Sequence, residues 1–203
     1  MKIKKLFALA LAGVMAVSML AGCSVGLKKD GEVTAAAVID SLSEDTTEMV
    51  SFKENIVLQA SLRKAADVDK GEAAKSAEDV AAAIADGNTN LTTTPLASSW
   101  EILNAFEFPA DKTFVAVVAM ENPDDTYTTS HVIKELAAKI EKVEVCEGKT
   151  IAEMPVKNTG SLTLDDEKCH YDLTYTGNIA VVTVGNTSYA AFTVTRTAKL
   201  VMD

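Results

Sequence analysis

The chain has 203 residues and a formal charge of −10 at pH 7, and 5% of its residues are aromatic. An acidic chain lacks the basic footprint that nucleic-acid binding requires, so we expect no nucleic-acid partner. The scarcity of aromatic residues argues against a large aromatic platform for carbohydrate binding.

The N-terminus has the parts of a secretory signal. Three lysines lie within the first five residues, and residues 6–19 are apolar apart from one glycine and one serine. That run is shorter than the roughly 20 apolar residues that a membrane-spanning helix needs. It is followed by Leu20-Ala21-Gly22-Cys23, and an exit of small residues is typical of a cleaved leader.

The Leu20-Ala21-Gly22-Cys23 stretch resembles the lipobox of bacterial lipoproteins, a resemblance that covers residues 1–23 only. It implies cleavage between Gly22 and Cys23 and attachment of a diacylglycerol, with acyl chains of the palmitate type, to the thiol of Cys23. Two acyl chains on one residue are enough for stable anchoring. We therefore expect a lipid-anchored protein on the extracytoplasmic face of the cell membrane. The alternative is an ordinary soluble secretory signal with a cysteine nearby by chance.

We divide the chain into a signal peptide (residues 1–22), a lipidated tether (residues 23–31) and a single domain (residues 32–203). Cleavage removes three lysines and takes the formal charge from −10 to −13. An anionic membrane repels such a body, so the lipid must hold it there. Residues 24–31 reach at most about 27 Å when fully extended, which keeps the domain close to the membrane.

The first half of the domain predicts helices and one ambiguous segment. Apolar residues at helical spacing predict a helix over Glu32–Leu42, which Ser43–Thr47 ends. In Met49–Lys64 apolar and polar residues alternate with the period of a strand, and we predict a strand there. The residue types of that segment fit a helix nearly as well. Ser76 caps a further helix, which ends at Asp86-Gly87-Asn88.

The second half predicts strands around one helix. Thr113–Met120 is a nearly unbroken apolar run that predicts a buried strand, and Ser130–Lys142 predicts an amphipathic helix. With Val143–Cys146 as the next strand, these segments form a β-α-β unit. From Gly160 onward, regularly spaced turn signals predict an antiparallel meander. The predicted turns are Asp165-Asp166, Thr176-Gly177-Asn178 and Gly185-Asn186. The fold class is therefore α+β, with N-terminal helices and a β-α-β unit followed by a C-terminal antiparallel β-meander.

Two cysteines remain once Cys23 is assigned to lipid. Outside the cytoplasm, leftover cysteines usually pair, so Cys146 and Cys169 are a candidate disulfide. The alternative is two separate buried thiols. The spacing does not match a Cys-x-x-Cys pattern, and His170 alone does not complete a ligand set, so we predict no metal site.

Catalytic patterns are missing from the sequence. His131 and His170 are the two histidines, and no Gly-x-Ser-x-Gly elbow, phosphate loop or dinucleotide-binding glycine pattern accompanies them. We assign no catalytic residue and no cofactor, and we read both histidines as solvated or capping residues.

Two groups of acidic or amide residues raise the question of a cation. The segment from Asp67 to Gly71, with Glu78 beyond it, echoes a calcium loop but lacks the third oxygen ligand and the central glycine. Asn122, Asp124 and Asp125 also carry oxygens, yet acids at a helix entry usually serve the helix. We therefore predict no calcium site.

The surface most suited to recognition is the polar loop Asn88–Ser99, because loops commonly carry function. Next to it lie Trp100, Phe106 and Phe108, which either pack in the core or line a groove, and core packing is the commoner use of such residues. No ligand-binding residue is assigned.

Two functions fit these observations. The first is a non-enzymatic module that binds an envelope protein, peptide or small ligand, or serves as an accessory to an envelope assembly. The second is an envelope hydrolase that uses scattered carboxylates and one histidine. A closed pocket that gathers a histidine with two carboxylates would favour the hydrolase, and a filled core with exposed histidines would favour the binding module.

Overall fold

A computed structural model describes residues 32–68, 75–97, 112–123, 126–157, 162–164 and 167–202. The chain divides into two compact units, Met1–Asp30 and Gly31–Asp203, and all of the described residues belong to the second. The predicted signal peptide and tether lie outside the described residues. Among the described helices, none is long and apolar enough to cross a bilayer.

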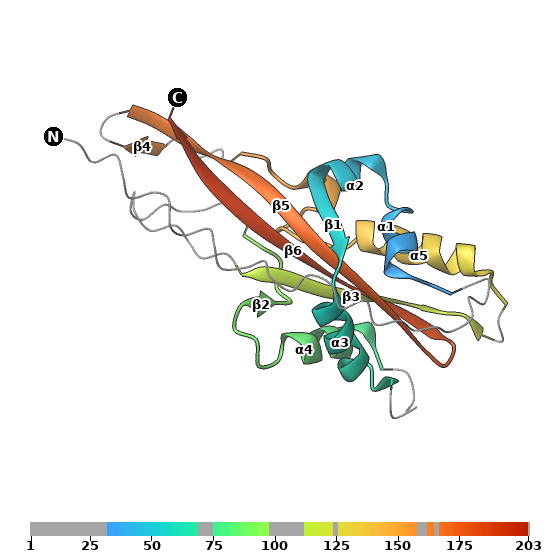
Figure 1. The fold of residues 1–203 in the computed structure, drawn as a ribbon. Coiled ribbons are helices and arrows are strands. Elements are labelled where there is room, and N and C mark those ends of the chain that lie inside the picture. The colour runs from blue at the N-terminus through green and yellow to red at the C-terminus, as the bar shows by residue number, and fades with distance from the viewer. Residues whose placement is uncertain are drawn as a thin grey trace. The chain divides into compact units, whose positions relative to one another are not determined.

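The second unit combines helices with one sheet (Figure 1). Its described helices are α1 (Ala35–Ile39), α2 (Glu44–Met49), α3 (Ile56–Ala65), α4 (Ala77–Ala85), α5 (Thr129–Glu141) and the 3-10 helix η3 (Ile151–Glu153). Its described strands are β1 (Val50–Glu54), β2 (Leu91–Thr92), β3 (Thr113–Glu121), β4 (Leu162–Leu164), β5 (Glu167–Val184) and β6 (Thr187–Met202).

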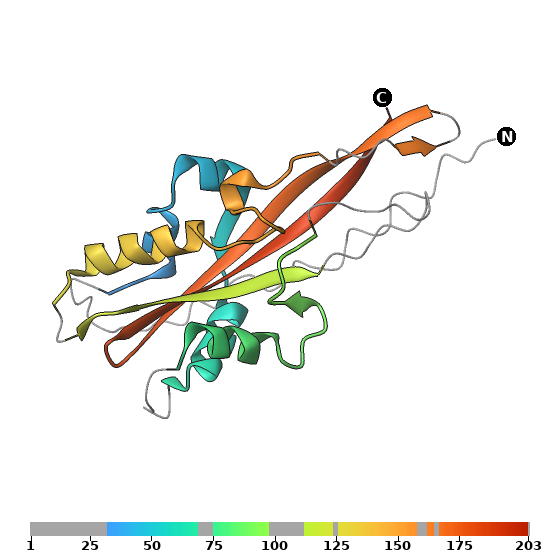
Figure 2. The same ribbon diagram turned by 180° about the vertical axis from the view of Figure 1, so that it is seen from behind.

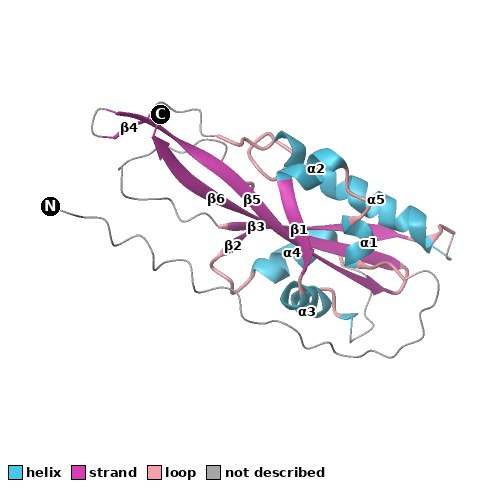
Figure 3. Cartoon of the chain, turned by 45° about the horizontal axis from the view of Figure 1, so that its top comes forward, coloured by secondary structure: helices cyan, strands magenta, loops and turns pink. Residues whose placement is uncertain are grey.

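The sheet is mixed, and a long hairpin forms its centre. The strand order is β1-β5-β6-β3-β2, with β4 pairing β5 beside this path. Strands β5 and β6 pair antiparallel from Cys169 opposite Met202 to Val184 opposite Thr187, and β3 pairs antiparallel with β6. The short outer strands are parallel to their neighbours, β1 to β5 and β2 to β3. Figure 3 shows the hairpin running through the sheet, and the predicted α+β class is confirmed.

Helices pack on both faces of the sheet (Figures 1 and 2). One face is covered by α1, α5 and η3, and the other by α3 and α4. The side chains that fill the first core include Val38, Leu136, Ile140, Ile151, Ile179 and Phe192. Those that fill the second include Leu58, Leu62, Val80, Ile84, Val182 and Tyr189.

The strand predicted over Met49–Lys64 is wrong for most of its length. Only Val50–Glu54 is extended, and α3 begins at Ile56. The reason is Asn55, whose side-chain oxygen accepts hydrogen bonds from the backbone N–H groups of Val57 and Leu58, both at 2.9 Å. This N-cap starts a helix whose buried positions, Leu58, Leu62 and Ala65, follow helical spacing.

The second strand of the predicted β-α-β unit is also absent from the described chain. After α5, residues Val143–Cys146 form no strand, and Cys146 makes only isolated bridges with Leu96 and Lys149. Because the backbone turns at Gly148, which has a φ of 70°, this segment returns on itself before a strand can extend.

The predicted turn at Thr176-Gly177-Asn178 is wrong as well, because β5 runs through it without interruption. Gly177 is needed there for space. A Cβ atom at this position would lie 2.7 Å from the carbonyl oxygen of Thr193 and would also meet the ring of Phe52. The meander is therefore one long hairpin with β4 at its side. The turn at Gly185-Asn186 is confirmed, and the one at Asp165-Asp166 lies outside the described residues.

The capped helices follow the predictions more closely. Ser76 caps α4 by accepting from the N–H of Asp79 at 3.1 Å, and α5 covers almost the whole of the predicted Ser130–Lys142 helix. The first predicted helix is shorter than Glu32–Leu42, because α1 spans Ala35–Ile39 and has Asp40 as its C-cap. Ser43, which was expected to end it, instead caps α2 by accepting from the N–H of Thr46. The segment expected to interrupt helical structure therefore starts a second short helix.

Candidate functional site

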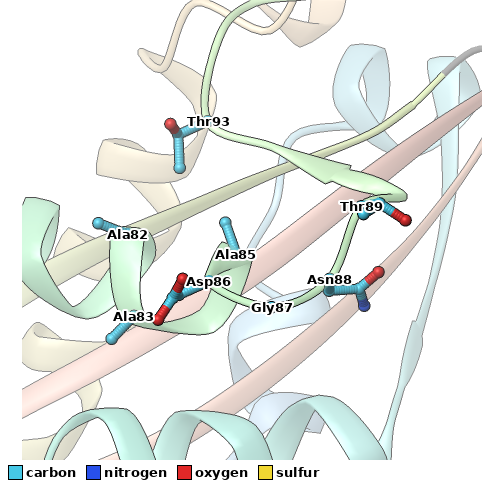
Figure 4. A pocket seen from close by; sticks show the side chains of 8 residues that line it. All are labelled: Ala82, Ala83, Ala85, Asp86, Gly87, Asn88, Thr89 and Thr93. Atoms are coloured by element: carbon cyan, nitrogen blue, oxygen red, sulfur yellow. The ribbon is translucent and has the colours of Figure 1, made fainter.

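A depression of about 710 Å³ lies between the C-terminal turn of α4 and the loop that follows it (Figure 4). We call it the α4 groove. Its lining residues are Ala82, Ala83, Ala85, Asp86, Gly87, Asn88, Thr89 and Thr93. It includes the first part of the Asn88–Ser99 loop, which the sequence predicts to be the recognition surface.

Local backbone geometry shapes the α4 groove. Gly87 has a φ of 74° directly after the C-cap residue Asp86, which is the left-handed position expected of a glycine that ends a helix. The N–H of Asn88 then donates to the carbonyl of Ala85 at 3.1 Å, and the side-chain oxygen of Asn88 accepts from the N–H of Asn90. These bonds turn the chain into β2, so the loop is held against the end of the helix.

The lining of the α4 groove combines apolar and hydrogen-bonding groups. Its helix side offers only alanine methyl groups, and its loop side offers the carboxylate of Asp86, the amide of Asn88 and the hydroxyls of Thr89 and Thr93. These groups donate and accept hydrogen bonds, but none of them is a histidine, cysteine or lysine that would act as a general base or an activated nucleophile.

A second depression, of about 590 Å³, lies at the edge of the sheet, and we call it the edge cavity. It is lined by Asp45, Thr47, Glu48, Met49, Ser51, Ala152, Val156, Leu173, Thr174 and Tyr175. The N–H of Leu173 donates to the carbonyl of Val156 at 2.9 Å, whereas β1 pairs with β5 only from Tyr175 onward. The cavity therefore marks the gap between the two segments that cover this edge of β5.

The edge cavity is lined by acidic side chains, and a hydrogen bond fixes one of its walls. Two carboxylates, from Asp45 and Glu48, line it, and no lysine or arginine is among its lining residues. The hydroxyl of Tyr175 donates to the carbonyl of Pro155 at 2.7 Å, which fixes the wall. Sequence reasoning did not single out these residues, because acids in an exposed helix look like ordinary solvated side chains until the sheet edge is placed beside them.

Next to this cavity, the carboxylate of Glu153 accepts hydrogen bonds from the backbone N–H of Thr150 at 3.1 Å and from its hydroxyl at 3.0 Å. These bonds stabilise the ionised form and hold the pKa of Glu153 below its usual range. The same bonds make Glu153 part of the capping box of η3.

The two histidines lie apart from both depressions. His131 is exposed in the first turn of α5, where its ring lies 4.7 Å from the ring of Tyr127. His170 is on β5, with Nε2 at 3.3 Å from the carboxylate of Asp172. Neither histidine lines the α4 groove or the edge cavity.

The predicted disulfide between Cys146 and Cys169 is not formed. Both residues are buried thiols in the described chain, which is the alternative arrangement. Cys146 is held beside Leu96 in the core beneath α5, whereas Cys169 lies in β5 opposite Met202, near the end of the long hairpin. The two backbone positions are therefore fixed by different elements, the loop after α5 for Cys146 and strand β5 for Cys169.

The candidate cation ligands are only partly described. Asp67 forms an ion pair with Lys75, and its φ of 53° places it in the left-handed region, while residues 69–74 lie outside the described residues. Asp124 and Asp125 also lie outside them, as do Trp100, Phe106 and Phe108. The described residues contain no group of three or more side chains suited to hold a metal ion.

No family of known proteins, no curated protein and no solved structure matches this chain.

Proposed function

We propose that this protein is a lipid-anchored module of the bacterial cell envelope that binds a protein, a peptide or a small ligand at the extracytoplasmic face of the membrane. The observation that carries the proposal is the Leu20-Ala21-Gly22-Cys23 stretch at the end of an apolar leader. Cys23 is the proposed site of lipid attachment, and the unit from Gly31 to Asp203 is the binding body.

The geometry of that body supports binding more than hydrolysis. A hydrolase of the kind considered above needs a histidine within hydrogen-bond reach of a nucleophile or water and an orienting carboxylate. His170 has one such carboxylate, from Asp172, but lies outside both depressions, and the ring of His131 lies at the surface, tilted by 35° against that of Tyr127. The α4 groove instead offers an apolar wall facing hydrogen-bonding groups, which is the chemistry of recognition.

Anchoring is tested at the N-terminus of the protein purified from its own cells. Mass spectrometry of the N-terminal peptide is expected to find Cys23 as the first residue, carrying a mass increase for lipid. The variant Cys23→Ala is expected to lose membrane association while keeping the far-ultraviolet circular dichroism of the folded body. An unmodified Cys23, or a leader still attached, would contradict the proposal.

Binding is tested by capture from the same cells with the acylated protein and two matched variants. Thr89→Arg places a long cation in the α4 groove, and Thr47→Arg places the same side chain in the edge cavity. We expect Thr89→Arg to lose a captured protein or small molecule that Thr47→Arg retains. Equal capture by both variants would exclude the α4 groove as the recognition surface.

A further inference from the structure

The exposed side of α3 differs from the rest of this acidic protein. Its buried side, Leu58, Leu62 and Ala65, packs in the core with α4. Its outward side, which we call the α3 face, is Ile56, Val57, Ala60, Arg63 and Lys64, all exposed. These five positions fall on one side of the helix because residues three, four and seven apart share a face.

Two large apolar side chains open the α3 face. Ile56 is 66% exposed and Val57 is 68% exposed, the two highest values among the exposed large apolar residues in the described chain. Single exposed apolar residues are ordinary, but here two lie next to each other in the first turn of one helix. The Asn55 cap fixes that turn, so both side chains are held outward.

Basic residues accompany this apolar pair. Residues 55–66 contain no acid in a chain with a formal charge of −10. Lys53 lies just before the helix, and the nearby carboxylate of Glu54 accepts from the N–H of Ala36 at 3.0 Å, which turns it toward α1. The neighbouring helix α4 has Glu78 and Asp79 in its first turn. Asp79 accepts from the hydroxyl of Ser76 at 2.7 Å, so this carboxylate takes part in the cap of α4.

We propose that the α3 face docks on the anionic bilayer into which the N-terminal lipid inserts, and so orients the body on the membrane. Helices that lie at a bilayer surface combine an exposed apolar patch with lysine and arginine side chains. Docking at this face reduces the repulsion that the rest of the acidic body meets at an anionic surface. This inference rests on the proposed anchor at Cys23.

The experiment uses the acylated full chain in vesicles that contain an anionic phospholipid. A polarity-sensitive fluorophore is attached to Val57→Cys in one sample and to Lys134→Cys, on the exposed side of α5, in the control. Labelling selects these positions because Cys146 and Cys169 are buried. We expect a blue shift and quenching by brominated lipid at position 57 and neither at position 134.

Surface variants separate the two parts of the contact. Ile56→Ser with Val57→Ser is expected to abolish the blue shift of a label placed at Ala60→Cys. Lys64→Gln is expected to lower the docked fraction relative to the undocked fraction about fivefold, the factor that about 1 kcal/mol per basic residue corresponds to. Raising the salt concentration is expected to weaken docking in the same direction.

The possible failures are distinguishable. If the acylated protein floats with the vesicles but positions 57 and 134 respond alike, the anchor stands and docking through α3 is excluded. If the protein does not float with the vesicles, the anchor itself fails. A blue shift at position 57 that appears without lipid and grows with protein concentration would assign the α3 face to contact with a second copy, and it would overturn the proposal.

Discussion

Gly177 lies directly opposite Phe52 across the parallel strands β5 and β1, and the phenylalanine ring fills the space that a side chain at residue 177 would take. On the other side, the carbonyl oxygen of Thr193 is 2.7 Å from the position of a Cβ atom. The same ring lies edge-on to Phe192 with the centroids 6.5 Å apart. The missing side chain at Gly177 therefore leaves room for Phe52 of the edge strand β1 to pack against the central hairpin.

This contact predicts the effect of filling it. Gly177→Val is expected to lower the free energy of unfolding by about 1–3 kcal/mol, because overpacking forces the backbone or the ring to move. The measurement is the midpoint of urea unfolding. Thr176→Ala, at the exposed neighbouring position, is the control and is expected to change stability by less than about 0.5 kcal/mol. Equal midpoints for Gly177→Val and the natural protein would show that Phe52 does not pack there.

The N-cap of α3 can be tested in the same assay. Asn55→Ala removes the oxygen that accepts from Val57 and Leu58, and it also removes a hydrogen bond at 3.2 Å to the side chain of Asn178. We expect a loss of about 1–2 kcal/mol. Asn55→Asp keeps the accepting oxygen and is expected to recover most of that loss. Equal losses in both variants would mean that the cap does not determine where the helix begins.

Tyr189 predicts an alkaline limit of stability. Its ring is fully buried, its hydroxyl donates to the carbonyl of Lys75 at 2.7 Å, and burial raises its pKa above the ordinary value of 10.0. The folded state therefore keeps this proton at a pH where the unfolded state has lost it. The resulting contribution to stability is complete below about pH 10 and is lost as the pH rises through the folded-state pKa.

The variant that isolates this effect is Tyr189→Phe, followed by chemical denaturation between pH 8 and pH 11. We expect a lower stability near pH 8, because the hydrogen bond to Lys75 is lost, and a smaller decline above pH 10 than in the natural protein. Burial also raises the pKa of Tyr171, so some decline is expected to persist. An unchanged slope in Tyr189→Phe would contradict the role of this proton.

The thiols provide a prediction that does not depend on stability. A thiol-reactive dye under non-reducing conditions is expected to react slowly with the folded acylated protein, because Cys146 and Cys169 are buried. In denaturant the same sample is expected to show two reactive thiols per chain, since acylation consumes the thiol of Cys23. No reactive thiol in denaturant would indicate a disulfide between Cys146 and Cys169, and a third would indicate that Cys23 is unmodified.

The elements that could be predicted from the sequence are those whose determinants lie close together in the chain. Ser76 and Gly87 bound α4, the apolar run at Thr113 forms β3, and the glycine at residue 185 turns the hairpin. Capping and turn geometry depend on hydrogen bonds between residues a few positions apart, so they can be read locally. The α+β class followed from the order of these elements.

Only the tertiary structure decided the remainder. The alternation in Met49–Lys64 fits a strand or a helix. The Asn55 cap sets where the helix begins, and the packing of Leu58 and Leu62 against β5 and α4 stabilises it. The parallel pairing of β1 with β5 joins residues more than 120 positions apart, and it forms both the edge cavity and the contact between Phe52 and Gly177. Long-range pairing depends on how apolar surface is shared among elements, and no local pattern contains that information. The leader and its cysteine, by contrast, lie outside the described residues, and they stay a prediction from the sequence alone, because their pattern depends on residue type and order.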